Sequence, residues 1–234
     1  MHYAIIAAGE GSRLQQEGVA WPKPLVRING VPMIKRLIDM MMELNPESLS
    51  IIVNEQMTQV QEYLRSLELP VPLHLKVKST PSSMHSFYEV ASLIPAEASK
   101  FVLTTVDTIF RQDDFARYVR GFEEDVPQGG YMGVTTYIDD EKPLYVDVDA
   151  DMRITAYCDA PFEGVKYISG GIYGLTPPAI DILRDCMDRG VSRMRNYQRA
   201  LIAAGYLLRA CDFSKVIDVD HASDIAVAEE MTRK

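Results

Sequence analysis

The sequence predicts an α/β fold in which helices cover both faces of a mostly parallel sheet. In the first half of the chain, short apolar runs alternate with segments of helical periodicity. This alternation is typical of βαβ units, because parallel strands need a crossover that is usually a helix. A glycine-rich loop at residues 9–13 follows the first apolar run, and Asp107 ends a later one. Since ligands bind beyond the carboxyl ends of such strands, we expect both features at one edge of the sheet.

Each element of the first half has a local sequence signal. The apolar run that begins at Tyr3 ends at Gly9, as expected for a buried strand. Pro32 is a favoured first helical residue, and it precedes an apolar segment of helix length. We predict strands at 3–8, 49–53, 73–77 and 101–106, and helices at 33–44, 56–68, 85–94 and 113–122.

After about residue 129 the pattern changes to several strand-like segments in succession. Short turns separate them, and no linker, repeat or low-complexity segment interrupts the chain. We therefore predict one domain spanning residues 1–234, with two continuous halves at 1–128 and 129–234. The second half is predicted to hold strands at 131–138, 144–148, 153–158, 167–175, 206–211 and 215–219, and helices at 178–187, 195–204 and 222–231.

The charge balance argues against nucleic acid or an anionic membrane as a partner. The chain has 24 Lys and Arg against 33 Asp and Glu, a formal net charge of −9, whereas such binders show basic patches. A small anionic ligand needs only a few local cations. No apolar run approaches the ~18 residues of a membrane span. Because the strand pattern begins at Tyr3, we also expect no signal peptide. Cys158, Cys186 and Cys211 form no CxxC pair, which predicts reduced structural thiols in a cytoplasmic protein.

Three kinds of phosphate-binding loop differ in the residues that they require, and residues 9–13 fit one of them. A Walker A loop requires Gly-Lys-Ser/Thr, which is absent here. A dinucleotide fingerprint requires glycine in place of Leu14 and an immediate helix, whereas we expect a long loop through residues 15–22. The third kind uses glycine backbone amides, a bidentate arginine and a point cation to hold a triphosphate. Arg13 and Lys23, the latter between two prolines, fit this kind.

Three segments together resemble the nucleotidyltransferase family of sugar-phosphate and phosphocholine nucleotidylyltransferases. They are AAGEGSR at 7–13, PKPL at 22–25 and INGVPMI at 28–34. The resemblance implies a Rossmann-like three-layer α/β/α fold with a mostly parallel mixed sheet, the nucleotide-diphospho-sugar transferase fold of the glycosyltransferase-A type. It makes residues 1–128 the nucleotide-binding half and residues 129–234 the acceptor-binding half.

The same resemblance implies roles for individual residues in the nucleotide-binding half. Catalytic roles fall on Arg13, Lys23 and Asp107. Ser83 and Ser86 lie where relatives cradle the base, although either could simply cap the following helix. The nucleotide-binding set is Ala7, Ala8, Gly9, Gly11, Ser12, Arg13, Asn54, Ser83 and Ser86.

Metal and acceptor ligands are implied further along the chain. Mg²⁺ is expected on Asp107 and Asp220, with Asp218 as the alternative because alternate strand residues face opposite sides. A lysine that relatives acting on sugar phosphates often carry is absent near Asp159, which argues against a standard hexose 1-phosphate acceptor. The acceptor-binding set is Lys23, Asp159, Gly170 and Gly171.

The implied reaction transfers a nucleoside monophosphate from a nucleoside triphosphate to a phosphorylated small molecule, with release of pyrophosphate. The acceptor would be a sugar 1-phosphate or a phosphocholine-like molecule. A molybdopterin nucleotidyltransferase and a nucleotide-sugar-dependent glycosyltransferase of the same broad fold are the alternatives. The long second half with Gly170 and Gly171 disfavours the first, and the absence of Asp-x-Asp at Asp107 disfavours the second. The base, the acceptor and a homo-oligomeric state stay open.

Overall fold

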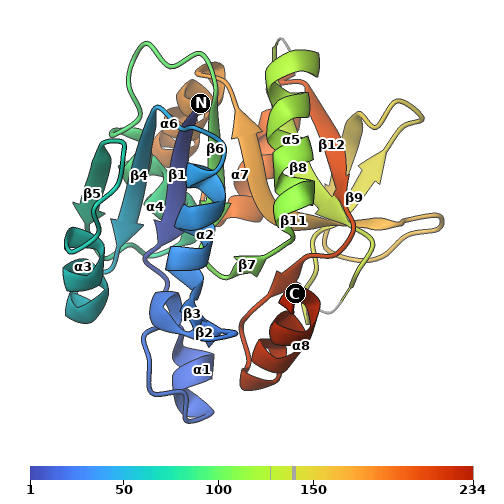
Figure 1. The fold of residues 1–234 in the computed structure, drawn as a ribbon. Helices are drawn as coiled ribbons and strands as arrows, with labels where there is room; N and C mark the ends of the chain where they lie inside the picture. Colours follow the sequence, from blue (N-terminus) through green and yellow to red (C-terminus); the bar gives the residue numbers. More distant parts are fainter. Residues whose placement is uncertain (127, 139–140, 234) are drawn as a thin grey trace.

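The computed structural model describes residues 1–126, 128–138 and 141–233, and these build one central sheet (Figure 1). Its first half is parallel: β1 pairs with β4 and β6, and β4 pairs with β5. The bounds are β1 (His2–Ala7), β4 (Ser48–Val53), β5 (Leu73–Val77) and β6 (Phe101–Thr105). The predicted parallel βαβ half is therefore confirmed.

The second half extends this sheet with mostly antiparallel strands, although β12 runs parallel to β8. The long strand β11 (Tyr167–Leu175) runs antiparallel to β6, and it also pairs with β8 and β9. The sheet order is β10-β9-β11-β6-β1-β4-β5, while β8 joins β11 to β12. The further bounds are β8 (Gly130–Thr135), β9 (Tyr145–Val148), β10 (Ile154–Cys158) and β12 (Leu208–Phe213).

Helices cover both faces of the sheet, which confirms the three-layer architecture. Alternate residues of β1 point to opposite faces, so Tyr3 and Ile5 join one hydrophobic core while Ala4 and Ile6 join the other. The first core is covered by α2 (Met33–Met42), α3 (Thr58–Arg65) and α5 (Gln112–Asp125). The second is covered by α4 (Ser83–Ala91), α6 (Pro178–Asp188) and α7 (Met194–Ala203).

A third, smaller core joins the two ends of the chain at the carboxyl edge of the sheet. Leu14, Ile28, Ile109, Val219 and Ala228 are buried in it. The short strand β13 (Ile217–Asp218) pairs antiparallel with β7 (Thr108–Ile109) and so brings the last segment beside Asp107. The other elements are α1 (Ser12–Gln16), a 3₁₀ turn at Lys23–Leu25, β2 (Arg27–Ile28), β3 (Val31–Pro32) and α8 (Ala222–Thr232).

Two sequence-based predictions need correction here. The long loop expected through residues 15–22 is shorter, because α1 begins directly after Gly11 and buries Leu14. The strands β2, β3 and β7 were not predicted, since each is two residues long and has no periodicity to recognise. The other predicted helices and strands are present, with ends shifted by a few residues.

The described residues contain no helix that is both long enough and apolar enough to cross a bilayer. In the same part of the chain, Cys158, Cys186 and Cys211 are free, and the last two are buried.

The aromatic packing under α4 generates a stability prediction. Phe87 is fully buried, with ring centroids 6.1 Å from Phe101 and 5.6 Å from Tyr197. We expect Phe87→Ala to lower the free energy of unfolding by about 3–5 kcal/mol, because a cavity replaces these contacts. The neighbouring Tyr88 is 39% exposed, so Tyr88→Ala should cost less than about 1 kcal/mol. Urea unfolding of both variants checks this, and equal midpoints would contradict the core assignment.

Candidate active site

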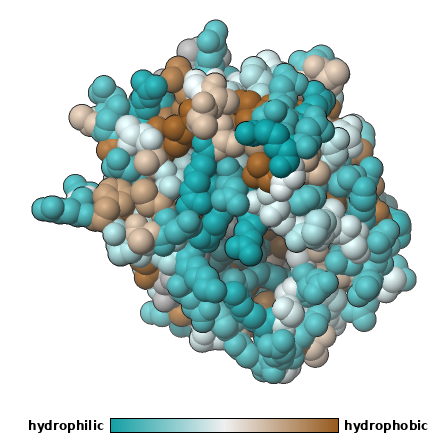
Figure 2. All heavy atoms as spheres, turned by 180° about the vertical axis from the view of Figure 1, so that it is seen from behind, coloured by the Kyte–Doolittle hydropathy of each residue, from teal (hydrophilic) through white to brown (hydrophobic). Residues whose placement is uncertain are grey.

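A cleft of about 600 Å³ lies at the carboxyl edge of the parallel strands. The loop after β1, the segment before α4 and the turn after β6 form its walls. The face seen in Figure 2 is hollowed and rimmed mainly by hydrophilic residues. The lining residues are Ile6, Ala8, Gly9, Glu10, Gly11, Ser12, Arg13, Lys23, Thr80, Pro81, Ser82, Ser83, Ser86, Thr105, Val106, Asp107 and Asp220.

Four charged side chains form a continuous chain of ion pairs in this cleft. Lys23 Nζ donates to Asp107 Oδ2 at 2.6 Å and to Asp220 Oδ1 at 2.6 Å. Arg13 donates to the other oxygen of Asp220 at 2.7 Å. The order of charges is therefore positive, negative, positive, negative, and each cation contacts at least one carboxylate.

The backbone around Asp107 explains how distant segments meet here. Val219 N–H donates to the carbonyl oxygen of Asp107 at 3.0 Å, next to the pairing of Asp218 with Thr108. Asp220 follows directly, and its Oδ1 accepts a hydrogen bond from Lys23 Nζ. Lys23 itself begins a 3₁₀ turn after Pro22, where the side chain is only 8% exposed.

The electrostatics keep these groups ionised. Burial by itself would lower the pKa of the Lys23 ammonium, but the carboxylates of Asp107 and Asp220 outweigh it and raise this pKa above its usual value. Burial opposes ionisation of Asp107 as well, yet Lys23 and a hydrogen bond from the Thr105 hydroxyl lower its pKa. The cleft therefore presents fixed charges near neutral pH.

The donor set of the cleft fits a hard divalent cation. The Oδ1 atom of Asp107 is buried and has no hydrogen-bond partner among the described residues. No group of three or more Asp, Glu, His or Cys side chains in the described part of the chain forms a complete metal site. Mg²⁺ is commonly held by one or two carboxylates together with substrate phosphates, so Asp107 and Asp220 suit it as partial ligands.

Gly11 sets the distance between the glycine loop and Lys23. It has a φ of +65°, which favours glycine, and a Cβ added there would lie 2.7 Å from Lys23 Cβ. A Cβ added at Gly9 would meet no described atom within 4 Å, so this part of the loop faces open space. The loop can thus bring its backbone close to a ligand while Lys23 stays packed against it.

Residues 3–131 match the family model of the MobA-like NTP transferase domain. The match covers more than half of the chain and includes the glycine loop, Lys23 and Asp107. The chain belongs to this family. The resemblance inferred from the loop residues is therefore confirmed.

Two curated relatives of this MobA-like NTP transferase are each 30% identical over part of the chain. One is the bifunctional protein GlmU of Prochlorococcus marinus, matched over 92 residues, 39% of this chain and 18% of the relative. The other is the 2-aminoethylphosphonate cytidylyltransferase of Lancefieldella rimae, matched over 89 residues, 37% of this chain and 36% of the relative. The chain therefore spans well under two thirds of the length of these relatives.

Solved structures share the whole fold at low sequence identity. The inositol-1-phosphate CTP transferase of T. maritima has a TM-score of 0.80 and 20% identity, and the match covers 99% of this chain and 95% of that one. A protein described as a glucose-1-phosphate thymidylyltransferase of Bacillus anthracis has a TM-score of 0.86 and 19% identity, with coverages of 100% and 96%. These likenesses confirm the fold class.

The structure brings most of the predicted nucleotide-binding residues of this MobA-like NTP transferase to the cleft. Exceptions are Ala7 and Asn54, which are buried behind it. Asn54 donates to the carbonyl oxygen of Ala8 at 3.3 Å and accepts from the Ser79 hydroxyl at 3.0 Å. Through these two hydrogen bonds, Asn54 connects the glycine loop to the segment before α4. The predicted nucleotide-binding residues that line the cleft are Ala8, Gly9, Gly11, Ser12, Arg13, Ser83 and Ser86.

The predicted acceptor residues are more dispersed. Asp159 is exposed and pairs with Arg195 at 2.6 Å and Arg199 at 2.8 Å, outside the cleft. Gly171 has a φ of +71° and packs against Thr108, where a Cβ would lie 2.6 Å from the Thr108 hydroxyl. Gly170 lines a second cavity beside the cleft. Acceptor contacts by these three residues stay a prediction.

Asp218 and Asp220 point to different places. Asp220 contacts Arg13 and Lys23 and lines both the cleft and the second cavity, whereas Asp218 lines only the second cavity. This geometry favours Asp220 as the partner of Asp107.

Several cleft and cavity residues were missed from the sequence. Thr80 lies in the loop before α4, and its hydroxyl oxygen lies 2.6 Å from that of Ser86. The polar, turn-rich sequence of this loop was a signal that could have identified Thr80. Tyr137 and Glu141 line the second cavity from the segment between β8 and β9. No local pattern marks them, because only the packing of that segment against β13 brings them close.

The contact between Gly11 and Lys23 can be tested by comparing two glycines. Both Gly11→Ala and Gly18→Ala place a side chain at a positive φ, which costs about 1–2 kcal/mol of stability. Gly11→Ala should cost about 1–3 kcal/mol more because it clashes with Lys23, while no described atom lies near Gly18. Urea unfolding measures the difference. Equal losses in the two variants would show that Lys23 is not packed on the loop.

Proposed function

We propose that the protein transfers a nucleoside monophosphate from a nucleoside triphosphate to a phosphorylated small molecule and releases pyrophosphate. The observation that carries the proposal is the convergence of Arg13, Lys23, Asp107 and Asp220 on one cleft beside the glycine loop. Residues 1–128 form the nucleotide-binding half and residues 129–234 the acceptor-binding half of one domain.

The reaction requires neutralised charge more than proton transfer. An oxygen of the acceptor phosphate forms a bond to the α-phosphorus, and the bond from that phosphorus to the pyrophosphate oxygen breaks. The acceptor oxygen is already anionic, so no general base is needed. Repulsion between two anions is the obstacle, and Lys23 and Arg13 reduce it by pairing with phosphate oxygens.

The pairing within the cleft is suited to an exchange of partners. Phosphate oxygens would replace the carboxylates around Lys23 and Arg13, and Asp107 and Asp220 would then be available to hold Mg²⁺. When bound, Mg²⁺ supplies further neutralisation of the phosphate charge. The glycine loop would contribute backbone N–H groups to the triphosphate.

The names of the similar proteins support this reaction class. The solved neighbours are named for transfer to inositol 1-phosphate and glucose 1-phosphate, and one curated relative for transfer to 2-aminoethylphosphonate. These acceptors differ in their organic part and share a phosphate or phosphonate. The shared anionic part suits the cations Arg13 and Lys23 of the cleft, so the variable part is expected to bind elsewhere.

Removing the central charges tests the proposed function. We expect Lys23→Met and Asp107→Asn each to lower pyrophosphate release by about 10²–10³-fold. The first variant removes a cation that would pair with the reacting phosphates, and the second removes a carboxylate that would hold Mg²⁺. Lys35→Met is the matched control, since Lys35 forms an exposed pair with Asp39 on α2. The assay combines each of the four nucleoside triphosphates with a panel of phosphomonoesters in Mg²⁺. Circular dichroism verifies the fold, and undiminished turnover in folded Lys23→Met would refute the assignment.

The roles of Asp218 and Asp220 can be separated by their metal dependence. We expect Asp220→Asn to raise the Mg²⁺ concentration for half-maximal rate by about tenfold or more, because it removes a direct carboxylate ligand. Asp218→Asn is the control for the Mg²⁺ requirement alone: it should leave this concentration nearly unchanged, even if the lost charge in the second cavity changes the rate with a given acceptor. A wild-type Mg²⁺ requirement in Asp220→Asn would assign Asp220 a purely structural role.

A further inference from the structure

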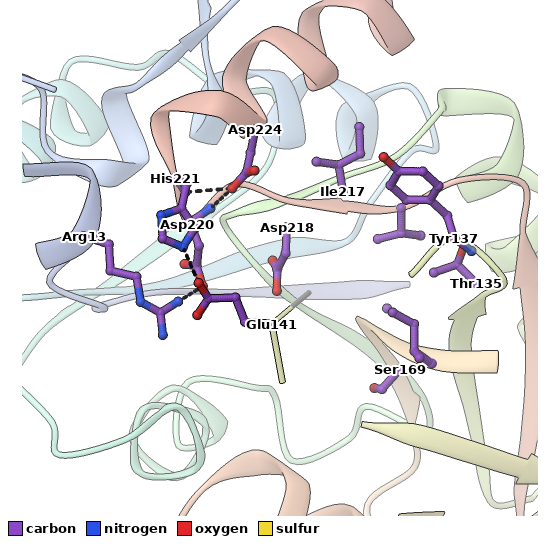
Figure 3. A pocket seen from close by; sticks show the side chains of 13 residues that line it. Arg13, Thr135, Tyr137, Glu141, Ser169, Ile217, Asp218, Asp220, His221 and Asp224 are labelled. Carbon is purple, nitrogen blue, oxygen red and sulfur yellow. Dashed lines mark hydrogen bonds and ion pairs between the residues drawn. The ribbon is translucent and has the colours of Figure 1, made fainter. Parts of the chain in front are cut away.

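A second cavity of about 60 Å³ adjoins the cleft (Figure 3). Arg13, Asp220 and His221 lie on one side of it, and Tyr137 and Ser169 on the other. Its remaining lining residues are Thr135, Glu141, Ile168, Gly170, Val216, Ile217, Asp218 and Asp224.

The cavity and the cleft share a wall. Arg13 and Asp220 line both spaces, and Asp220 contacts the Lys23 ammonium. A molecule whose phosphate reaches Lys23 could therefore place its organic part in the second cavity. This arrangement agrees with the expectation that the phosphate or phosphonate, which the acceptors share, and the organic part, which varies, bind in different places.

The volume of the cavity limits what it can hold. About 10–15 Å³ is enough for one water molecule, so a cavity of about 60 Å³ has room for a compact organic group. An aminoethyl or trimethylammonium group fits.

The charges that face the cavity are predominantly negative. Four carboxylates line it, against two basic side chains, Arg13 and His221. His221 already pairs with Glu17 at 2.6 Å, and its second ring nitrogen lies 3.6 Å from Glu141. Even with Lys215, which lies beside Tyr137, the acidic groups outnumber the basic ones.

The aromatic ring in the cavity wall is a second, independent feature. Lys215 Nζ lies 4.0 Å from the centroid of the Tyr137 ring, so one face of this ring already holds an ammonium group, and an acceptor ammonium would use the part of the ring that lines the cavity and that Lys215 leaves open. An aromatic face beside carboxylates is a favourable environment for an organic cation, because both the ring quadrupole and the carboxylates attract positive charge.

We propose that the acceptor is a small phosphorylated or phosphonylated amine, whose ammonium group binds in this cavity near Glu141, Asp218 and Tyr137. Its phosphate or phosphonate oxygen then lies toward Lys23. The inference rests on the proposed function, and it narrows the acceptor to a zwitterion with a compact cationic end.

The test compares charged acceptors with uncharged molecules of the same shape. Phosphocholine is paired with 3,3-dimethylbutyl phosphate, and phosphoethanolamine with propyl phosphate. Pyrophosphate release is measured for each with the four nucleoside triphosphates and Mg²⁺. We expect kcat/KM to be at least about tenfold higher for the charged member of the preferred pair, the size of one charge-assisted contact.

Glu141→Gln tests whether the cavity is responsible for this preference. We expect the KM of the charged acceptor to rise by about tenfold with little change in kcat, while the KM of the uncharged member stays the same. Glu97→Gln removes the same charge from an exposed site before β6, at the opposite edge of the sheet, and should change neither KM.

The outcomes separate the two proposals. Equal use of the charged and uncharged members, or an unchanged KM in Glu141→Gln, overturns the cationic acceptor. Turnover of glucose 1-phosphate or inositol 1-phosphate in preference to the amines also overturns it, while nucleotidyl transfer stands. Absence of pyrophosphate release with every acceptor overturns the proposed function itself.

Discussion

The buried ammonium of Lys23, held between the carboxylates of Asp107 and Asp220, is the interaction on which the site depends. Placing a charge in a protein interior costs several kcal/mol unless opposite charges and hydrogen bonds compensate it. The compensating groups lie 84 and 197 residues away in the sequence. The pairing of β7 with β13 and the small core beneath it therefore have a clear physical role, because they deliver both carboxylates to one cation.

Under the proposed function, the same interaction reconciles an acidic chain with an anionic substrate. The protein has a formal net charge of −9, yet Arg13 and Lys23 lie together at the end of the parallel strands. Each is held by a carboxylate, which keeps the cation in position without a ligand. Under the proposed function, phosphate groups take over this pairing. The cleft would then select ligands by the charge of their phosphate groups. The neighbouring cavity would select the organic part of the acceptor by its size and charge.

The parts predicted from the sequence were those with strong local patterns. Apolar runs and helical stripes predicted the parallel half of the sheet and the helices on both faces, and the glycine loop and Lys23 indicated the family. The short pairings β2–β3 and β7–β13 were missed, because two residues carry no periodicity. The placement of Asp159 beside Arg195 and Arg199, outside the cleft, was also not foreseen. Its sequence position shows only that it follows a strand, and not which helix packs beside that strand.

The sequence by itself determined the α/β class, the family and the candidate residues of the phosphate-binding loop, since these depend on local periodicity and on a short motif. The tertiary structure alone decided that Asp220 contacts Lys23 while Asp218 faces a separate cavity, and that Tyr137 and Glu141 line that cavity. These relations join segments far apart in the chain. They arise from strand pairing and core packing, which no short stretch of sequence encodes.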